Sequence, residues 1–171
     1  MQETHFLWEC QKVILQSFWG GPTISGSISN LRQVVERFGV DQKGKIFSVG
    51  DEFVIHVFHS HFAASICEEL NIESLDSSIT SENTNEWLRS TAESMVRSTI
   101  MPTGTADPAY AFHRSLMRAG FFYTDLRNAI RFEQGPDIYC LTMETLAVVF
   151  SGHRKTKLYH RGRQHAMQYH V

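Results

Sequence analysis

A glutamate and two histidines recur at helical spacing in the first half of the chain. Glu52, His56 and His59 occupy positions i, i+4 and i+7, which places them on one face of a helix. Side chains of these types can bind a metal ion, as in the zinc-binding His-Glu-x-x-His helix. That motif is absent, no further ligand can be placed from the sequence, and His61 is rotated well off this face. We therefore expect ordinary helical histidines and no bound metal.

Two arginines one helical turn apart form a second candidate site. Arg127 and Arg131 are flanked by Asp125 and Glu133. Stacked arginines can hold a phosphate or a carboxylate. The alternative is a solvated helix face whose arginines pair with acidic side chains of a neighbouring element. The charge pattern favours this alternative, and Arg127 and Arg131 are kept as candidate binding residues.

Acidic residues could also gather into a site for a divalent cation, although nothing in their spacing requires it. The residues concerned are Asp51, Asp125, Glu133 and Asp137. The chain has no phosphate-binding glycine loop, nucleophile elbow or Ser–His–Asp arrangement that can be argued. The sequence therefore predicts no catalytic residue, no cofactor and no metal ligand.

The C-terminal segment is basic, whereas the rest of the chain is acidic. Residues 153–171 contain no acidic residue and five basic ones, namely Arg154, Lys155, Lys157, Arg161 and Arg163. The other eleven basic residues and all eighteen acidic residues lie in residues 1–152, which gives that part a net charge of −7. A nucleic-acid-binding domain usually carries positive charge on its folded face. We predict a flexible tail that contacts nucleic acid weakly or lies against the acidic body.

Composition indicates a folded intracellular protein in the nucleus or the cytoplasm. Hydrophobic residues make up 42% of the chain and aromatic residues 12%, which is enough for a packed core. Cys10, Cys67 and Cys140 are too few and too far apart for a disulfide framework or a zinc site, so we expect buried free thiols. We find no secretory signal and no apolar segment of membrane-spanning length.

Hydrophobic spacing and turn signals predict six helices. Ser29 is expected to cap the second helix, Ser48-x-x-Asp51 to form a capping box for the third, and Asp107 to cap the fifth ahead of Pro108. The expected helices span residues 5–19, 29–38, 48–70, 85–99, 108–132 and 137–150. The β-branched and aromatic residues of 53–58 leave a strand as the alternative there.

These helices predict an all-α fold with one irregular domain over residues 1–152, followed by the basic tail of residues 153–171. The third and fifth helices are the longest and most apolar, so we expect them to form the centre of the core. The core residues expected on this basis are Phe53, Phe58, Phe62, Leu116, Tyr123 and Leu126.

Four stretches resemble a eukaryotic family known only as a domain of unknown function, number 6589. They are residues 6–8 (FLW), 29–32 (SNLR), 45–53 (KIFSVGDEF) and 120–131 (GFFYTDLRNAIR), of which the last is the most specific. The resemblance covers residues 5–139 and implies a transposon-derived origin, but it brings no activity and no catalytic residue. Typical members are several times longer and have a long region before this part, whereas after residue 138 the chain departs from the family pattern.

We therefore expect a non-enzymatic helical fragment of a transposon-derived protein that acts at most through binding. The first alternative is a fragment of a nuclease-like or transposase-like enzyme that is inactive on its own. The second is a protein–protein interaction module, which differs from the enzyme fragment because it needs a large exposed apolar patch.

Overall fold

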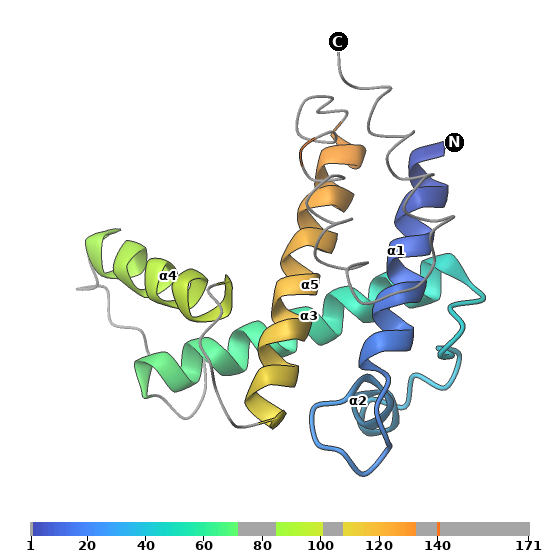
Figure 1. Cartoon of the computed structure of the whole chain (residues 1–171), viewed down its shortest axis with the longest axis horizontal. Helices are drawn as coiled ribbons and strands as arrows, with labels where there is room; N and C mark the ends of the chain where they lie inside the picture. Colours follow the sequence, from blue (N-terminus) through green and yellow to red (C-terminus); the bar gives the residue numbers. More distant parts are fainter. Residues whose placement is uncertain (1, 72–84, 101–107, 133–139, 141–171) are drawn as a thin grey trace.

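The computed structural model describes residues 2–71, 85–100, 108–132 and 140 (Figure 1). This part of the chain contains five helices and no strand, which confirms the predicted all-α fold. The helices are α1 (Gln2–Phe18), α2 (Ile28–Val34), α3 (Phe47–Leu70), α4 (Asn85–Ile100) and α5 (Pro108–Arg131). Residues 53–58 are helical and lie within α3. The expected sixth helix, except for Cys140, and the tail of residues 153–171 lie outside the described residues.

Helices α1, α3 and α5 pack against one another and enclose the core. Figure 1 shows α1 and α5 side by side, with α3 crossing both of them, and α4 packs against α3 and α5. Five of the six expected core residues are buried, namely Phe53, Phe58, Leu116, Tyr123 and Leu126. Phe62 is only half-buried. Helix α1 supplies a third side of the core through Leu7, Cys10 and Ile14.

Helix α2 is displaced and shorter than expected. Its N-cap is Ser27, whose side chain accepts a hydrogen bond of 3.1 Å from the backbone N–H of Asn30, so the assignment of the cap to Ser29 is wrong. The helix ends at Val34 because Glu36 adopts a left-handed conformation with φ of +54°. The backbone N–H groups of Glu36 and Arg37 bond back to Gln33 and Arg32, as in a Schellman motif.

Helix α3 begins without the expected capping box. Its N-cap is Ile46, which makes no side-chain cap hydrogen bond, and Ser48 and Asp51 lie inside the helix. The carboxylate of Asp51 is instead bonded to Tyr123 and Arg127 of α5. The pattern Ser-x-x-Asp is therefore accidental here, because the acidic side chain serves a tertiary contact.

The three cysteines are free, but they differ in burial. Cys10 is buried in the core, Cys67 is partly buried and Cys140 is exposed. The expectation of three buried thiols is therefore wrong for two of them. None of the helices in the described part of the chain has the length and apolar character required to span a bilayer.

Candidate functional site

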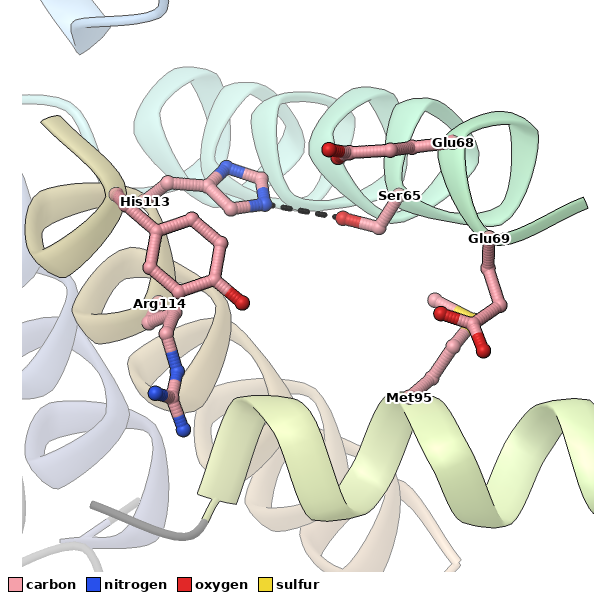
Figure 2. Close-up of a pocket in the computed structure, with 7 residues that line it drawn as sticks. Ser65, Glu68, Glu69, Met95, His113 and Arg114 are labelled. Carbon is pink, nitrogen blue, oxygen red and sulfur yellow. Dashed lines mark hydrogen bonds between the residues drawn. The ribbon is translucent and has the colours of Figure 1, made fainter. Parts of the chain in front are cut away.

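A pocket of about 280 Å³ opens where α3, α4 and α5 meet (Figure 2). Polar and charged side chains dominate its wall, and they come from segments far apart in the sequence. Helix α3 contributes Ser65, Glu68 and Glu69, α4 contributes Met95, and α5 contributes Tyr110, His113 and Arg114. The pocket is at the small end of the range for ligand sites, so it could accept a small molecule or a single side chain.

A chain of hydrogen bonds leads from this pocket into the protein. Figure 2 shows His113 directed at Ser65, and its Nε2 lies 3.0 Å from Ser65 Oγ. His113 Nδ1 lies 2.8 Å from Nδ1 of His61, and His61 Nε2 lies 2.9 Å from the carbonyl oxygen of Gly26. Ser65 Oγ also donates to the carbonyl oxygen of His61 at 2.9 Å. These hydrogen bonds join α3, α5 and the loop before α2.

The carbonyl oxygen of Gly26 fixes the tautomers of both rings. This oxygen can only accept, so His61 must carry its proton on Nε2, and Nδ1 of a neutral His61 is then an acceptor. His113 must therefore donate from Nδ1. Its unprotonated Nε2 can only accept, and the single hydroxyl proton of Ser65 is donated either to this nitrogen or to the carbonyl oxygen of His61. Each ring has one defined role while His61 is neutral.

Burial shifts both histidines toward the neutral form. Desolvation lowers the pKa of His61, and the hydrogen bond to Gly26 opposes this shift in part. Desolvation and the neighbouring His61 lower the pKa of His113, whereas the carboxylate of Glu68 raises it. The two rings therefore resist protonation until the pH falls below the ordinary histidine pKa of about 6.5.

Ser65 and His113 resemble a nucleophile and base, but the backbone of their own helices supplies no oxyanion hole. A serine beside a histidine that is oriented by a third group is the usual geometry of an activated hydroxyl. Ser65 and His113 both lie inside long helices, whose interior N–H groups are committed to helical hydrogen bonds. These groups are therefore not available to form an oxyanion hole. The arrangement is better suited to relaying or sensing a proton.

The histidines of the sequence-based metal hypothesis lie apart from this pocket. His56 and His59 are exposed on α3, and Glu52 pairs with Arg37 at 2.9 Å. No three metal-ligating side chains converge anywhere in the described part of the chain. His61, which is off that face, is the histidine of this helix that makes tertiary contacts.

The two candidate arginines of α5 have different surroundings. Arg127 pairs with Asp51 at 3.0 Å, as expected if the arginines bond to acidic side chains of a neighbouring element. Arg131 is exposed and lies over the ring of Phe132, 5.8 Å from its centroid. Asp125 is exposed, whereas Asp51 is buried and bonds to Tyr123 and Arg127. The remaining candidates lie outside the described residues, namely Glu133, Asp137, Arg154, Lys155, Lys157, Arg161 and Arg163.

A second candidate site is the apolar surface at the end of α2. Val34, Val35 and Phe38, which we call the α2 surface, are 69%, 54% and 63% exposed. These residues were expected on a helix ending near residue 38, whereas α2 ends at Val34 and the other two lie beyond its end. Ile46, at the start of α3, is also exposed.

Sequence reasoning missed the His61–His113 pair because the two residues are 52 positions apart on different helices. No local motif connects them. The one sequence signal is that both are histidines within helices expected to be apolar and central, where an ionisable side chain needs a partner.

Residues 1–166 match the family of unknown function DUF6589. The chain belongs to this family. The match extends well beyond residue 139, so the expectation that the family pattern ends there is wrong, and most of the basic segment is part of the DUF6589 pattern. No curated protein and no solved structure matches this DUF6589 chain.

Proposed function

We propose that this DUF6589 chain is a binding module without catalytic activity of its own, and that it contacts a protein partner through the α2 surface. The observation that carries the proposal is the exposure of three large apolar side chains within five positions. Single exposed apolar residues are ordinary on a protein surface, whereas clustered ones mark interaction sites. A protein-interaction module needs such a cluster, and a nuclease-like fragment does not.

Arg32 supports the proposal because it holds the α2 surface in one shape. Its Nε donates to the carbonyl oxygen of Val40 at 2.7 Å, and its Nη2 donates to the carbonyl oxygen of Phe38 at 2.9 Å. Its guanidinium also lies over the rings of Trp19 and Phe38. A surface fixed before binding loses less conformational entropy when the partner arrives.

The charges around the α2 surface indicate the chemistry of the partner. Residues 32–46 contain four basic and two acidic residues, for a net charge of +2, whereas the rest of residues 1–152 has seven basic and sixteen acidic residues. This local reversal of sign favours a partner that presents apolar side chains flanked by carboxylates. An amphipathic acidic helix or strand has this chemistry.

Site-specific photo-crosslinking in cells tests the proposal. A p-benzoylphenylalanine at position 38 replaces one aromatic side chain by another, and the same group at position 89 is the control because Arg89 is exposed on α4. We expect protein adducts from position 38 that are absent from position 89 and that weaken when Lys43 and Lys45 are changed to Glu. Equal adduct patterns at the two positions would contradict the proposal.

A second binding function is favoured by the basic segment of residues 153–171. Five basic residues without an acidic one can contact phosphates, and such binding depends steeply on salt. Binding of single-stranded and double-stranded oligonucleotides can be measured for the full chain and for a chain lacking residues 153–171. We expect weak binding whose salt dependence flattens in the shortened chain, and unchanged binding would exclude this segment.

The origin and location that we propose rest on the sequence. We propose that the chain derives from a transposon-encoded protein and works inside the cell, in the nucleus or the cytoplasm. Three widely separated cysteines, which support no disulfide framework, agree with a reducing compartment. A nuclease-like fragment, in contrast, requires that added divalent metal and nucleic acid produce cleavage products. A cleavage assay with Mg²⁺ and Mn²⁺ distinguishes it from a binding module.

A further inference from the structure

The hydrogen-bonded histidines connect the interior of the helical core to the loop that carries α2. His61 binds the carbonyl oxygen of Gly26, and Gly26 directly precedes Ser27, the N-cap residue of α2. Gly26 has a φ of +75°, and a Cβ atom there would lie 3.1 Å from Cε1 of His61. The ring of His61 therefore packs closely on the turn that starts α2.

We propose that His61 and His113 form a proton-sensitive latch that holds the loop before α2 against the core. The latch is closed while His61 is neutral and accepts the proton of His113 Nδ1. It opens when both rings are protonated, because two N–H groups then face each other at the 2.8 Å separation. Two positive charges would also be placed in contact.

The first proton that the pair takes up does not break the latch. It adds to Nε2 of His113, which then donates to Ser65 Oγ, and the Ser65 hydroxyl donates to the carbonyl oxygen of His61. Every hydrogen bond from His113 to Gly26 then joins one donor to one acceptor. The second proton has only Nδ1 of His61 to occupy, so it is the second step that opens the latch. The two rings titrate as a coupled pair.

The charged groups around the two histidines set the pH at which each protonation step occurs. On α3 the carboxylates of Glu68 and Glu69 line the pocket beside His113, and on α5 the guanidinium of Arg114 and the phenol of Tyr110 do so. Helix α4 contributes Met95 to the lining. Residues 19–28, which form the loop and the start of α2, contain no charged side chain. Glu68 favours the first proton on His113. The loop has no carboxylate that could compensate the positive charge added by the second proton.

The pocket gives solvent a route to the latch. His113 and Ser65 both line it (Figure 2), whereas His61 is not among the lining residues and bonds to Gly26. Protons therefore reach His113 directly and His61 through the hydrogen bond between the rings. Opening of the latch frees the turn at Gly26 and Ser27, and with it the start of α2. The consequence for partner binding rests on the proposed function of the α2 surface, but the latch itself does not.

An NMR titration of the full chain between pH 7.5 and 4.5 tests the latch directly. The imidazole signals of His61 and His113 report protonation, and the backbone amide signals of residues 24–30 report the loop. We expect both rings to titrate below the ordinary histidine pKa of about 6.5, and we expect the amides to shift with the second step. Amides that do not respond to that step, or rings that titrate at or above a pH of about 6.5, would overturn the proposal.

A substitution separates the latch from other effects of acid. His61→Gln keeps an N–H donor for Gly26 but cannot take up a proton, and His56→Gln is the matched control on the same helix. The unfolded rings gain protons as the pH falls through about 6.5 and the folded pair does so later, so acid should favour unfolding. We expect the unfolding equilibrium constant of wild type to rise about threefold or more from pH 6.5 to 5.0. The upper limit is about tenfold per pH unit for each proton that the unfolded chain binds and the folded protein does not.

The two variants have opposite expected results. His56→Gln should keep both the pH dependence of unfolding and the loop response, whereas His61→Gln should flatten both. If His61→Gln does not fold at pH 7.5, the titration of wild type decides alone. If the latch is confirmed but adducts from position 38 do not change with pH, only the link to the α2 surface is wrong.

Discussion

The hydroxyl of Tyr123 donates a hydrogen bond of 2.7 Å to Asp51, and this contact joins α5 to α3 across 72 positions of sequence. Nε of Arg127 lies 3.1 Å and 3.0 Å from the two oxygens of the same carboxylate. Burial and the contact with Asp51 raise the pKa of Tyr123, so the phenol stays protonated and donates. The carboxylate is thus both paired and hydrogen-bonded, which is what its burial requires.

Removal of this carboxylate should destabilise the fold. Asp51→Ala leaves the buried Tyr123 hydroxyl and the Arg127 guanidinium without their acceptor, and we expect a loss of about 2–4 kcal/mol in the free energy of unfolding. Tyr123→Phe removes one hydrogen bond but leaves Asp51 paired with Arg127, so it should cost about 1–2 kcal/mol. Urea unfolding measures both values.

The exposed pair Arg37–Glu52 provides the control for these variants. Both side chains are about half exposed, so Arg37→Ala should cost less than about 1 kcal/mol. If Asp51→Ala costs no more than Arg37→Ala, the contact between α3 and α5 does not stabilise the protein.

Asp51 also illustrates what could be predicted from the sequence. Its position three residues after Ser48 matched a capping box, because that pattern is local, but its true partners are 72 and 76 positions away. The boundaries of α1, α3, α4 and α5 were predicted to within three residues at each end, since glycine, proline and polar turn residues are read locally. Contacts between helices have no such local signal.

The sites were predicted less well than the helices for the same reason. The histidines at helical spacing, His56 and His59, attracted attention because periodicity reveals a shared face. The pair that the fold brings together, His61 and His113, depends on how α3 crosses α5. Val35 and Phe38 of the α2 surface lie beyond an early helix end at Glu36, whose left-handed conformation nothing in its type predicts.

Phe58 and Phe62 should differ in their contribution to stability. Phe58 is buried and stacks on Phe62, whereas Phe62 is half-buried at the edge of the same cluster. Phe58→Ala should cost about 3–5 kcal/mol, as large-to-small changes in a core do. Phe62→Ala should cost clearly less because the space it leaves is open to solvent. Thermal melts of the two variants compare them, and equal losses would place Phe62 in the core.

Gly120 allows α5 to approach α3 at Phe58. A Cβ atom at position 120 would overlap the ring and the Cβ of Phe58, so Gly120→Ala should destabilise the protein by about 1–3 kcal/mol, although alanine favours a helix. The control is Gly39→Ala, since a Cβ there would meet Val49 Cγ1 at an ordinary 3.8 Å. Chemical denaturation should find little change in the control. A gain in stability for Gly120→Ala would show that the helices have room to separate.

Glu36 should be a position where glycine is better than the native residue. It occupies the left-handed position after the C-cap of α2, where the Cβ of any other residue costs about 1–2 kcal/mol. Glu36→Gly should therefore stabilise the protein by about 0.5–1 kcal/mol after the greater entropy of glycine in the unfolded chain is subtracted. Glu36→Ala is the control, because it removes the same charge but keeps the Cβ. We expect urea unfolding to find a gain for glycine only, and crosslinking from position 38 should persist in both variants. Equal stability of the two variants would mean that α2 ends for another reason.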